Sequence, residues 1–251
     1  LLGEEPLSIR VEGKPYAVVM RTPGEEIAHV AGFCLGEGII DSPADAASIA
    51  YCDPETTNVV AVTLSPSRRK SVAAVLDRRN YISQTSCGLC GKELVQDLYQ
   101  EVRPVPDGAA IAVSAALAGL AAMSTHQPLR DRTHASHAAS LMDAQGGLIA
   151  IAEDIGRHNA LDKAVGKALL DGRLERTALL VMSSRISYEL VQKAARARIP
   201  AILSVSRPTA LAVALAGRLN IGLACLAPRQ GVYVFCRSER FRLDEDPPTG
   251  G

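Results

Sequence analysis

The chain has 251 residues and a mass of 26.5 kDa, and its 27 Lys+Arg balance its 27 Asp+Glu, so the formal net charge is zero. This balance excludes a global field that would attract nucleic acid or an anionic membrane surface, so any anion site must be local. No apolar run approaches the roughly 20 residues of a membrane-spanning helix, and no signal peptide is evident. Six cysteines are too few for a disulfide scaffold, which favours a reducing cytoplasm.

The first part of the chain predicts a β-hairpin followed by a helix. Apolar and polar residues alternate at 7–11 and 16–20, on either side of a turn, which is typical of paired strands. Thr22 suits the N-cap of the next helix and Pro23 its first position, and Gly36 suits its end. These elements indicate a small α+β unit.

A boundary between two domains is predicted near the middle of the chain. Residues 59–64 predict another strand, and residues 65–70 predict a solvated basic turn. Prolines and a glycine interrupt the pattern at 104–108. We therefore predict one domain over residues 1–105 and a second over residues 106–251.

The second half alternates strands and helices. After an alanine-rich helix and a hairpin, each strand is followed by a helix, which predicts helices packed on a mostly parallel sheet. The predicted fold class is thus α/β for this half, and α+β for the chain as a whole. The predicted helices cover 114–124, 159–170, 187–198 and 208–219, and the predicted strands cover 137–142, 148–152, 178–182, 201–205, 221–226 and 232–236.

A C-x-x-C motif is the first place to expect chemistry. The stretch T-S-C-G-L-C-G-K at 85–92 contains Cys87 and Cys90 and leads into an amphipathic run of helical spacing. A thiol near a helix N-terminus, with Lys92 close by, is expected to have a lowered pKa and to be thiolate more often. The thiolate exchanges sulfur and also binds metal, so both chemistries have to be considered.

Four further cysteines lie singly along the chain. Their surroundings are largely apolar, which favours buried, inert thiols. They are Cys34, Cys52, Cys225 and Cys236.

Polar residues follow three strands of the predicted sheet. In open α/β sheets, ligands lie beyond the carboxyl ends of the strands, where helix N-termini point. Each of the three ends carries an arginine, in E-D-I-G-R-H-N at 153–159, S-S-R-I-S at 183–187 and S-R-P-T at 206–209. The arginines and hydroxyls suit a phosphate or diphosphate group, although hydroxyls such as those of Ser187 and Thr209 are also common helix caps.

Zinc binding is the main alternative use of the two cysteines. His134 and His137 would complete a Cys2His2 site with Cys87 and Cys90, which gives a zinc-stabilised nucleotide-binding module without transfer chemistry. The strand context of the histidines counts against this site. No βαβ unit surrounds Cys87, which disfavours a thioredoxin-like redox motif. Zinc deaminase chemistry is excluded because the helix starts lack P-C-x-x-C.

Together these stretches resemble the formate dehydrogenase accessory sulfurtransferase family, FdhD. The resemblance runs along almost the whole chain and is most specific in C-G-L-C-G at 87–91 and E-D-I-G-R-H-N-A-L-D-K at 153–163. The other matching stretches are E-P-L at 5–7, T-P at 22–23, G-F at 32–33, E-G at 37–38, R-x-S-x-E at 185–189 and P-T at 208–209.

The resemblance implies a sulfur carrier. Cys87 or Cys90, with Cys87 favoured, would accept persulfide sulfur from a cysteine desulfurase. The sulfur would pass to the molybdenum of the bis-molybdopterin guanine dinucleotide cofactor (Mo-bis-MGD), which then enters formate dehydrogenase. This cofactor would be a bound substrate, and no permanent metal is expected. The implied fold has a cytidine-deaminase-like three-layer C-terminal domain with a smaller N-terminal domain, in a cytoplasmic homodimer.

Candidate cofactor-binding residues follow from the helix starts and from the resemblance. At three places the chain departs from the family pattern: T-G-G-x-H reads T-H-A-S-H at 133–137, S-G-R reads S-S-R at 183–185, and G-F-x-R aligns with C-L-A-P at 225–228, just before Arg229. The candidates are Arg157, His158, Asn159, Arg185, Ser187, Arg229 and His137.

Overall fold

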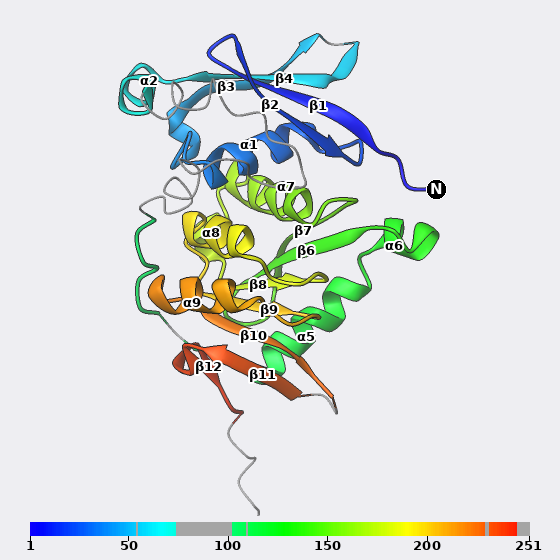
Figure 1. Cartoon of the computed structure of the whole chain (residues 1–251), viewed down its shortest axis with the longest axis vertical. Helices are drawn as coiled ribbons and strands as arrows, with labels where there is room; N and C mark the ends of the chain where they lie inside the picture. The colour runs from blue at the N-terminus through cyan, green and yellow to red at the C-terminus, as the bar shows by residue number, and fades with distance from the viewer. Residues whose placement is uncertain (54, 74–101, 109, 229–230, 245–251) are drawn as a thin grey trace, which may run out of the picture.

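The computed structural model describes residues 1–53, 55–73, 102–108, 110–228 and 231–244. A four-stranded sheet and a six-stranded sheet lie on either side of helices α1 and α7 (Figure 1). The helices are α1 (Glu26–Gly36), α2 (Pro66–Ser71), α5 (Val113–Ser124), α6 (Pro128–Thr133), α7 (Arg157–Leu170), α8 (Tyr188–Arg196) and α9 (Ala210–Arg218). The strands are β1 (Glu5–Val11), β2 (Lys14–Arg21), β3 (Ala46–Asp53), β4 (Thr56–Leu64), β5 (Ile111–Ala112), β6 (His137–Met142), β7 (Leu148–Asp154), β8 (Leu179–Met182), β9 (Ala201–Ser204), β10 (Gly222–Ala227), β11 (Gly231–Cys236) and β12 (Phe241–Arg242).

The four-stranded sheet has the order β2-β1-β4-β3 and contains the predicted hairpin. Leu7, Ile9 and Val11 of β1 are buried on the face that looks toward α1, as their alternation predicts. The sequence did not indicate β3, because most of its residues are exposed and show no apolar alternation.

The predicted basic turn at 65–70 is wrong, because the segment forms helix α2. Ser65 caps this helix, and its Oγ accepts a hydrogen bond from the Arg68 amide. The Arg68 side chain is only 13% exposed and donates to the carbonyl oxygens of Gly38 and Ile39. It therefore fixes the loop after α1 instead of lying in solvent.

The predicted start of α1 at Thr22 is also wrong. The helix begins at Glu26, and Thr22 is buried against the second half of the chain. Its hydroxyl oxygen accepts from the Ile155 amide at 3.1 Å, and its own amide donates to Asp154 at 3.0 Å. A long-range partner thus takes the hydroxyl that a helix cap would have used.

The six-stranded sheet has the order β11-β10-β9-β8-β6-β7, and only its centre is parallel. Strands β8, β9 and β10 pair in parallel, whereas β6 is antiparallel to β7 and β8, and β11 is antiparallel to β10. The prediction of a mostly parallel sheet therefore holds only for β8–β10. The links from β6 to β7 and from β10 to β11 are too short for a crossover, which enforces antiparallel pairing.

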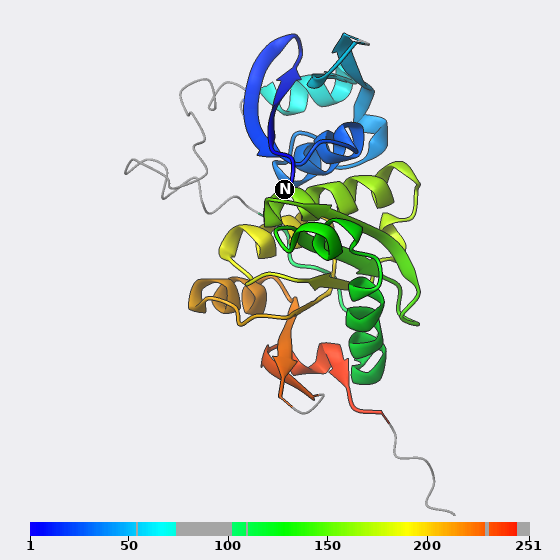
Figure 2. The same cartoon turned by 90° about the vertical axis from the view of Figure 1, so that its right-hand side faces the viewer.

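Helices cover both faces of the six-stranded sheet and give the predicted three layers. Helices α7, α8 and α9 cover one face and α5 covers the other (Figure 2). One buried cluster fills the α7–α9 face and a second fills the α5 face. The larger cluster continues without interruption from Leu180 of β8 to Leu7 of β1, so the two halves of the chain share a core.

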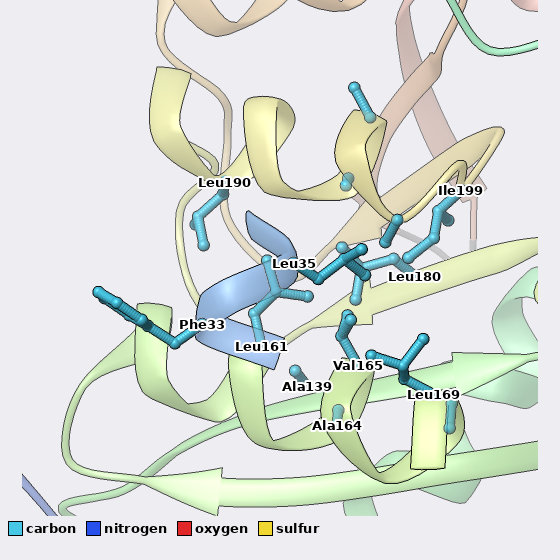
Figure 3. Close-up of a cluster of buried hydrophobic side chains, with 14 of the residues drawn as sticks. Phe33, Leu35, Ala139, Leu161, Ala164, Val165, Leu169, Leu180, Leu190 and Ile199 are labelled. Carbon is cyan, nitrogen blue, oxygen red and sulfur yellow. The ribbon is translucent and has the colours of Figure 1, made fainter. Parts of the chain in front are cut away.

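Helices α1 and α7 cross in very close contact. A Cβ atom at Gly32 of α1 would lie 1.9 Å from the Asp162 carbonyl oxygen, and one at Gly166 of α7 would lie 1.7 Å from the Ala28 carbonyl oxygen. Only glycine allows the two backbones to approach this closely. Around the crossing, apolar side chains of α1, α7 and α8 pack together with the sheet (Figure 3).

Candidate functional site

Strands β7, β8, β9 and β10 end at the same edge of the six-stranded sheet, which we call the carboxyl edge. Helices α7, α8 and α9 begin there. The start of α7 contacts the start of α8 through His158 Nε2 and Glu189 Oε2, which are 3.1 Å apart. The start of α9 contacts the loop before α8 through the Thr209 amide, which donates to the Ile186 carbonyl oxygen at 3.0 Å. The three helix starts therefore form one continuous strip.

Glu189 organises the part of the strip between α7 and α8. Its carboxylate accepts from Ser187 Oγ at 3.0 Å and pairs with His158. The hydrogen bond from His158, with the hydrogen bond from Ser187 and the charge of Arg157, lowers the pKa of Glu189 to about 2 despite partial burial. The carboxylate is therefore ionised at neutral pH and orients the imidazole.

His137 and Arg157 lie next to this group. His137 begins β6 directly opposite Asp154, and burial together with the charges of Arg157 and Arg130 lowers its pKa. The imidazole is thus neutral at neutral pH and offers one donor and one acceptor. Arg157 is half-buried, and its Nε has no hydrogen-bond partner among the described residues. Arg157 therefore keeps one buried donor that no described residue satisfies.

A buried carboxylate holds the start of α7 in place. Asp154 Oδ1 accepts from the Gly156 amide at 2.8 Å and from Asn159 Nδ2 at 2.9 Å. Asp154 Oδ2 accepts from the Thr22 amide at 3.0 Å and pairs with Lys163 Nζ at 2.7 Å. Four donors thus fix the turn that presents Arg157 and His158, and they tie it to the N-terminal half.

Asn159 lies deeper than the other candidates and makes internal contacts. It is 8% exposed, and its amide nitrogen donates to Asp154 and, at 2.7 Å, to the Met20 carbonyl oxygen. In the structure it positions the helix start, and a direct contact with the cofactor stays a prediction.

A second buried carboxylate positions α6, which sequence reasoning missed. Glu153 accepts from the amides of Leu129 and Arg130 and from Ser136 Oγ, at 2.7–2.9 Å. It thereby holds Arg130 near His137. No local pattern revealed Arg130, whereas Asp154 and Glu189 lie inside the motifs and were detectable there.

The remaining candidates differ in what the structure says about them. Arg185 is exposed in the loop before α8, next to the strip. Cys87, Cys90 and Arg229 lie outside the described residues. His134 is exposed at the end of α6 in a left-handed conformation. Among the described residues, no group of three or more His, Cys, Asp and Glu side chains is arranged to hold a metal ion.

The expectation of buried single cysteines is correct for two of the four. Cys34 and Cys225 are buried and Cys236 is half-buried. Cys52 is exposed on β3, a strand that the sequence did not indicate. The missed strand explains the error, because a sheet with an uncovered face leaves alternate side chains in solvent.

Comparison with known proteins matches this chain to one family. The model of the FdhD/NarQ family matches residues 2–242. The chain belongs to the FdhD/NarQ family. A family member named sulfur carrier protein FdhD from Streptomyces coelicolor is 40% identical over 97% of this chain and 89% of its own length. Another of that name from Anaeromyxobacter dehalogenans (strain 2CP-C) is 37% identical over 97% of this chain and 88% of its own length.

A solved structure from the family confirms the fold. The crystal structure of a formate dehydrogenase accessory protein from Desulfotalea psychrophila superposes with a TM-score of 0.74 at 25% identity, over 96% of this chain and 90% of that one. The mixed α/β architecture predicted from the sequence is therefore confirmed. In the part of the chain that the structure describes, no helix has both the length and the apolar character needed to cross a bilayer.

Proposed function

We propose that this family member is a sulfur carrier that supplies sulfur to the molybdenum of Mo-bis-MGD for formate dehydrogenase. Its membership of a family whose relatives are named sulfur carrier protein is the observation that carries the proposal. The C-G-L-C-G motif at 87–91 supplies the chemistry that such a carrier needs.

Sulfur is taken up by exchange between a thiolate and a persulfide. The thiolate of Cys87 or Cys90 attacks the outer sulfur of a cysteine desulfurase persulfide. A new S–S bond forms, the S–S bond of the donor breaks, and the desulfurase cysteine leaves as a thiolate. No net oxidation occurs in this step.

Release of the sulfur uses the second cysteine. With the persulfide on Cys87, the Cys90 thiolate attacks the inner sulfur, forms a Cys87–Cys90 disulfide and expels hydrosulfide toward the metal. The expelled sulfur gains two electrons, which the two cysteines lose on forming the disulfide. A dithiol reductant then restores both thiols.

The carboxyl edge is the proposed receiver of the cofactor's nucleotide arms. Arg157 and Arg185 bring positive charge, and His137, His158 and Ser187 bring polar groups, all at the starts of α7 and α8 or beside them. Diphosphates bind well to guanidinium groups and helix N-termini. We include Asn159 as a positioning residue and Arg229 as a further predicted contact.

The decisive experiment is intact-mass analysis after incubation with a cysteine desulfurase and cysteine. The wild type should gain about 32 Da, the mass of one sulfur atom, and the Cys87→Ala variant should not. Cys52→Ala is the matched control, because Cys52 is exposed and far from the motif in sequence. A wild type without the added mass, or a gain that persists in the Cys87→Ala, Cys90→Ala double variant, contradicts sulfur transfer.

Two further outcomes would point elsewhere. Stoichiometric zinc that disappears in Cys90→Ala would favour the zinc-stabilised nucleotide-binding module. Formate dehydrogenase activation that survives replacement of both cysteines would favour a cofactor chaperone. We also propose that the protein is a cytoplasmic homodimer, and light scattering during size-exclusion chromatography tests the dimer.

A further inference from the structure

Arg207 and Tyr233 form a pair at one end of the carboxyl edge. Arg207 follows β9 in the loop before α9, and its guanidinium carbon lies 5.4 Å from the centre of the Tyr233 ring. Tyr233 of β11 is paired with Cys225 of β10, which is paired with Ser204 at the end of β9. Two strands and a helix start that are separate in sequence therefore bring the two side chains together.

Both members of the pair are accessible. Tyr233 is 46% exposed, and Arg207 is exposed too. Within the described parts of the chain, no carboxylate pairs with Arg207, and its guanidinium lies over the Tyr233 ring. An aromatic ring and a free guanidinium are groups on which proteins stack nucleobases.

The pair continues the strip of helix starts. The Thr209 amide joins the start of α9 to Ile186, and Glu189 joins the start of α8 to His158. Adjacent strands lie about 4.8 Å apart, so β8 and β11 are separated by about 14 Å across the sheet. An extended nucleotide diphosphate reaches over such a distance, from a charged end beside Arg185 to a base beside Tyr233.

We propose that Arg207 and Tyr233 form a stacking site for a purine base of the nucleotide-bearing substrate. This inference rests on the proposed function and adds a specificity element to it. The diphosphate lies toward the starts of α7 and α8, and the base lies against the Tyr233 ring beside the guanidinium. The site binds a planar, electron-rich ring by stacking, and it contributes little to the binding of phosphate alone.

Calorimetric titration with GDP, and separately with inorganic diphosphate, tests the site. Loss of a base–aromatic stack corresponds to at least about a fivefold loss of affinity, so Tyr233→Ala should weaken GDP binding by that factor or more. Tyr233→Phe should stay within about twofold of the wild type, because the ring is kept. Binding of inorganic diphosphate should be the same in all three proteins.

The control is Val234→Ala, which removes an exposed side chain from the opposite face of the same strand. It should leave GDP binding unchanged. Equal GDP affinity of Tyr233→Ala and wild type, equal losses for GDP and inorganic diphosphate, or no GDP binding by the wild type would each overturn the stacking site. Sulfur loading, measured by mass on Tyr233→Ala, is expected to be normal. That readout separates failure of this site from failure of the proposed function.

Discussion

Asp154 and Lys163 form a buried ion pair, with 2.7 Å between Oδ2 and Nζ and side chains that are 0% and 2% exposed. The same ammonium group donates to the Thr22 carbonyl oxygen at 2.7 Å. The pair therefore joins the end of β7, the middle of α7 and the segment between β2 and α1. It supports the turn that carries Arg157 and His158.

Replacing Lys163 by Met should destabilise the protein by about 3–5 kcal/mol, because the Asp154 carboxylate would stay buried without its counter-charge. Urea unfolding monitored by circular dichroism measures the change. Lys167→Met is the matched control on the same helix. Lys167 pairs with Glu25 and donates to the Ile151 carbonyl oxygen at 2.7 Å, but the two paired side chains are 31% and 39% exposed, so its loss should cost about 1–2 kcal/mol. An equal loss of unfolding free energy in the two variants would show that burial of the Asp154–Lys163 pair does not add to the stability of the protein.

Replacing Gly166 by Ala should destabilise the fold by about 3 kcal/mol or more, because the new Cβ would overlap the Ala28 carbonyl and force α1 and α7 apart. Thermal and urea unfolding measure the effect. Gly217→Ala in α9 is the control, since a Cβ there meets nothing within 4 Å. That variant should gain about 0.5–1 kcal/mol from improved helix propensity. A Gly166→Ala protein as stable as wild type would contradict the close helix contact.

Acid should destabilise the protein through His29. Burial, together with the charges of Lys163, Lys193 and Arg21, lowers the pKa of His29 to about 3. In the unfolded chain this residue binds a proton near its ordinary pKa of 6.5, whereas the folded protein keeps it uncharged. The stability of the fold is therefore unaffected by this group above pH 6.5 and falls progressively between pH 6.5 and 3. Within this range, His29 lowers the free energy of unfolding by up to about 1.4 kcal/mol for each pH unit. Unfolding free energies measured across this range should fall less steeply in His29→Leu, and identical slopes would refute the assignment.

Native thiol labelling should separate Cys34 from Cys52. Cys34 is fully buried in α1, and burial raises its pKa. A reagent therefore cannot reach the sulfur, and the thiol stays protonated and unreactive. Cys52 is exposed on β3. Iodoacetamide followed by peptide mass mapping should modify Cys52 in the native protein and Cys34 only after unfolding. Equal rates at the two cysteines in the native protein would show that the α1 core opens readily.

The sequence by itself determined most of the local structure. The predicted hairpins and the helices and strands after residue 110 are present, with small shifts at their ends, because apolar periodicity reports which residues face a core. The run E-D-I-G-R-H-N at 153–159 marked the start of α7, and it contains Asp154, the residue that anchors this start.

Only the tertiary structure decided which distant segments meet. Thr22 looked like a helix cap from its neighbours, yet Asp154 and Ile155 bind it from more than a hundred residues away. Strand direction likewise depended on the length of the links, and the sheet is parallel only where helices connect the strands. The sequence did not indicate that Arg207 and Tyr233 lie together. A local pattern reports only the periodicity of one helix or strand, whereas contacts between elements arise from the packing of the whole chain.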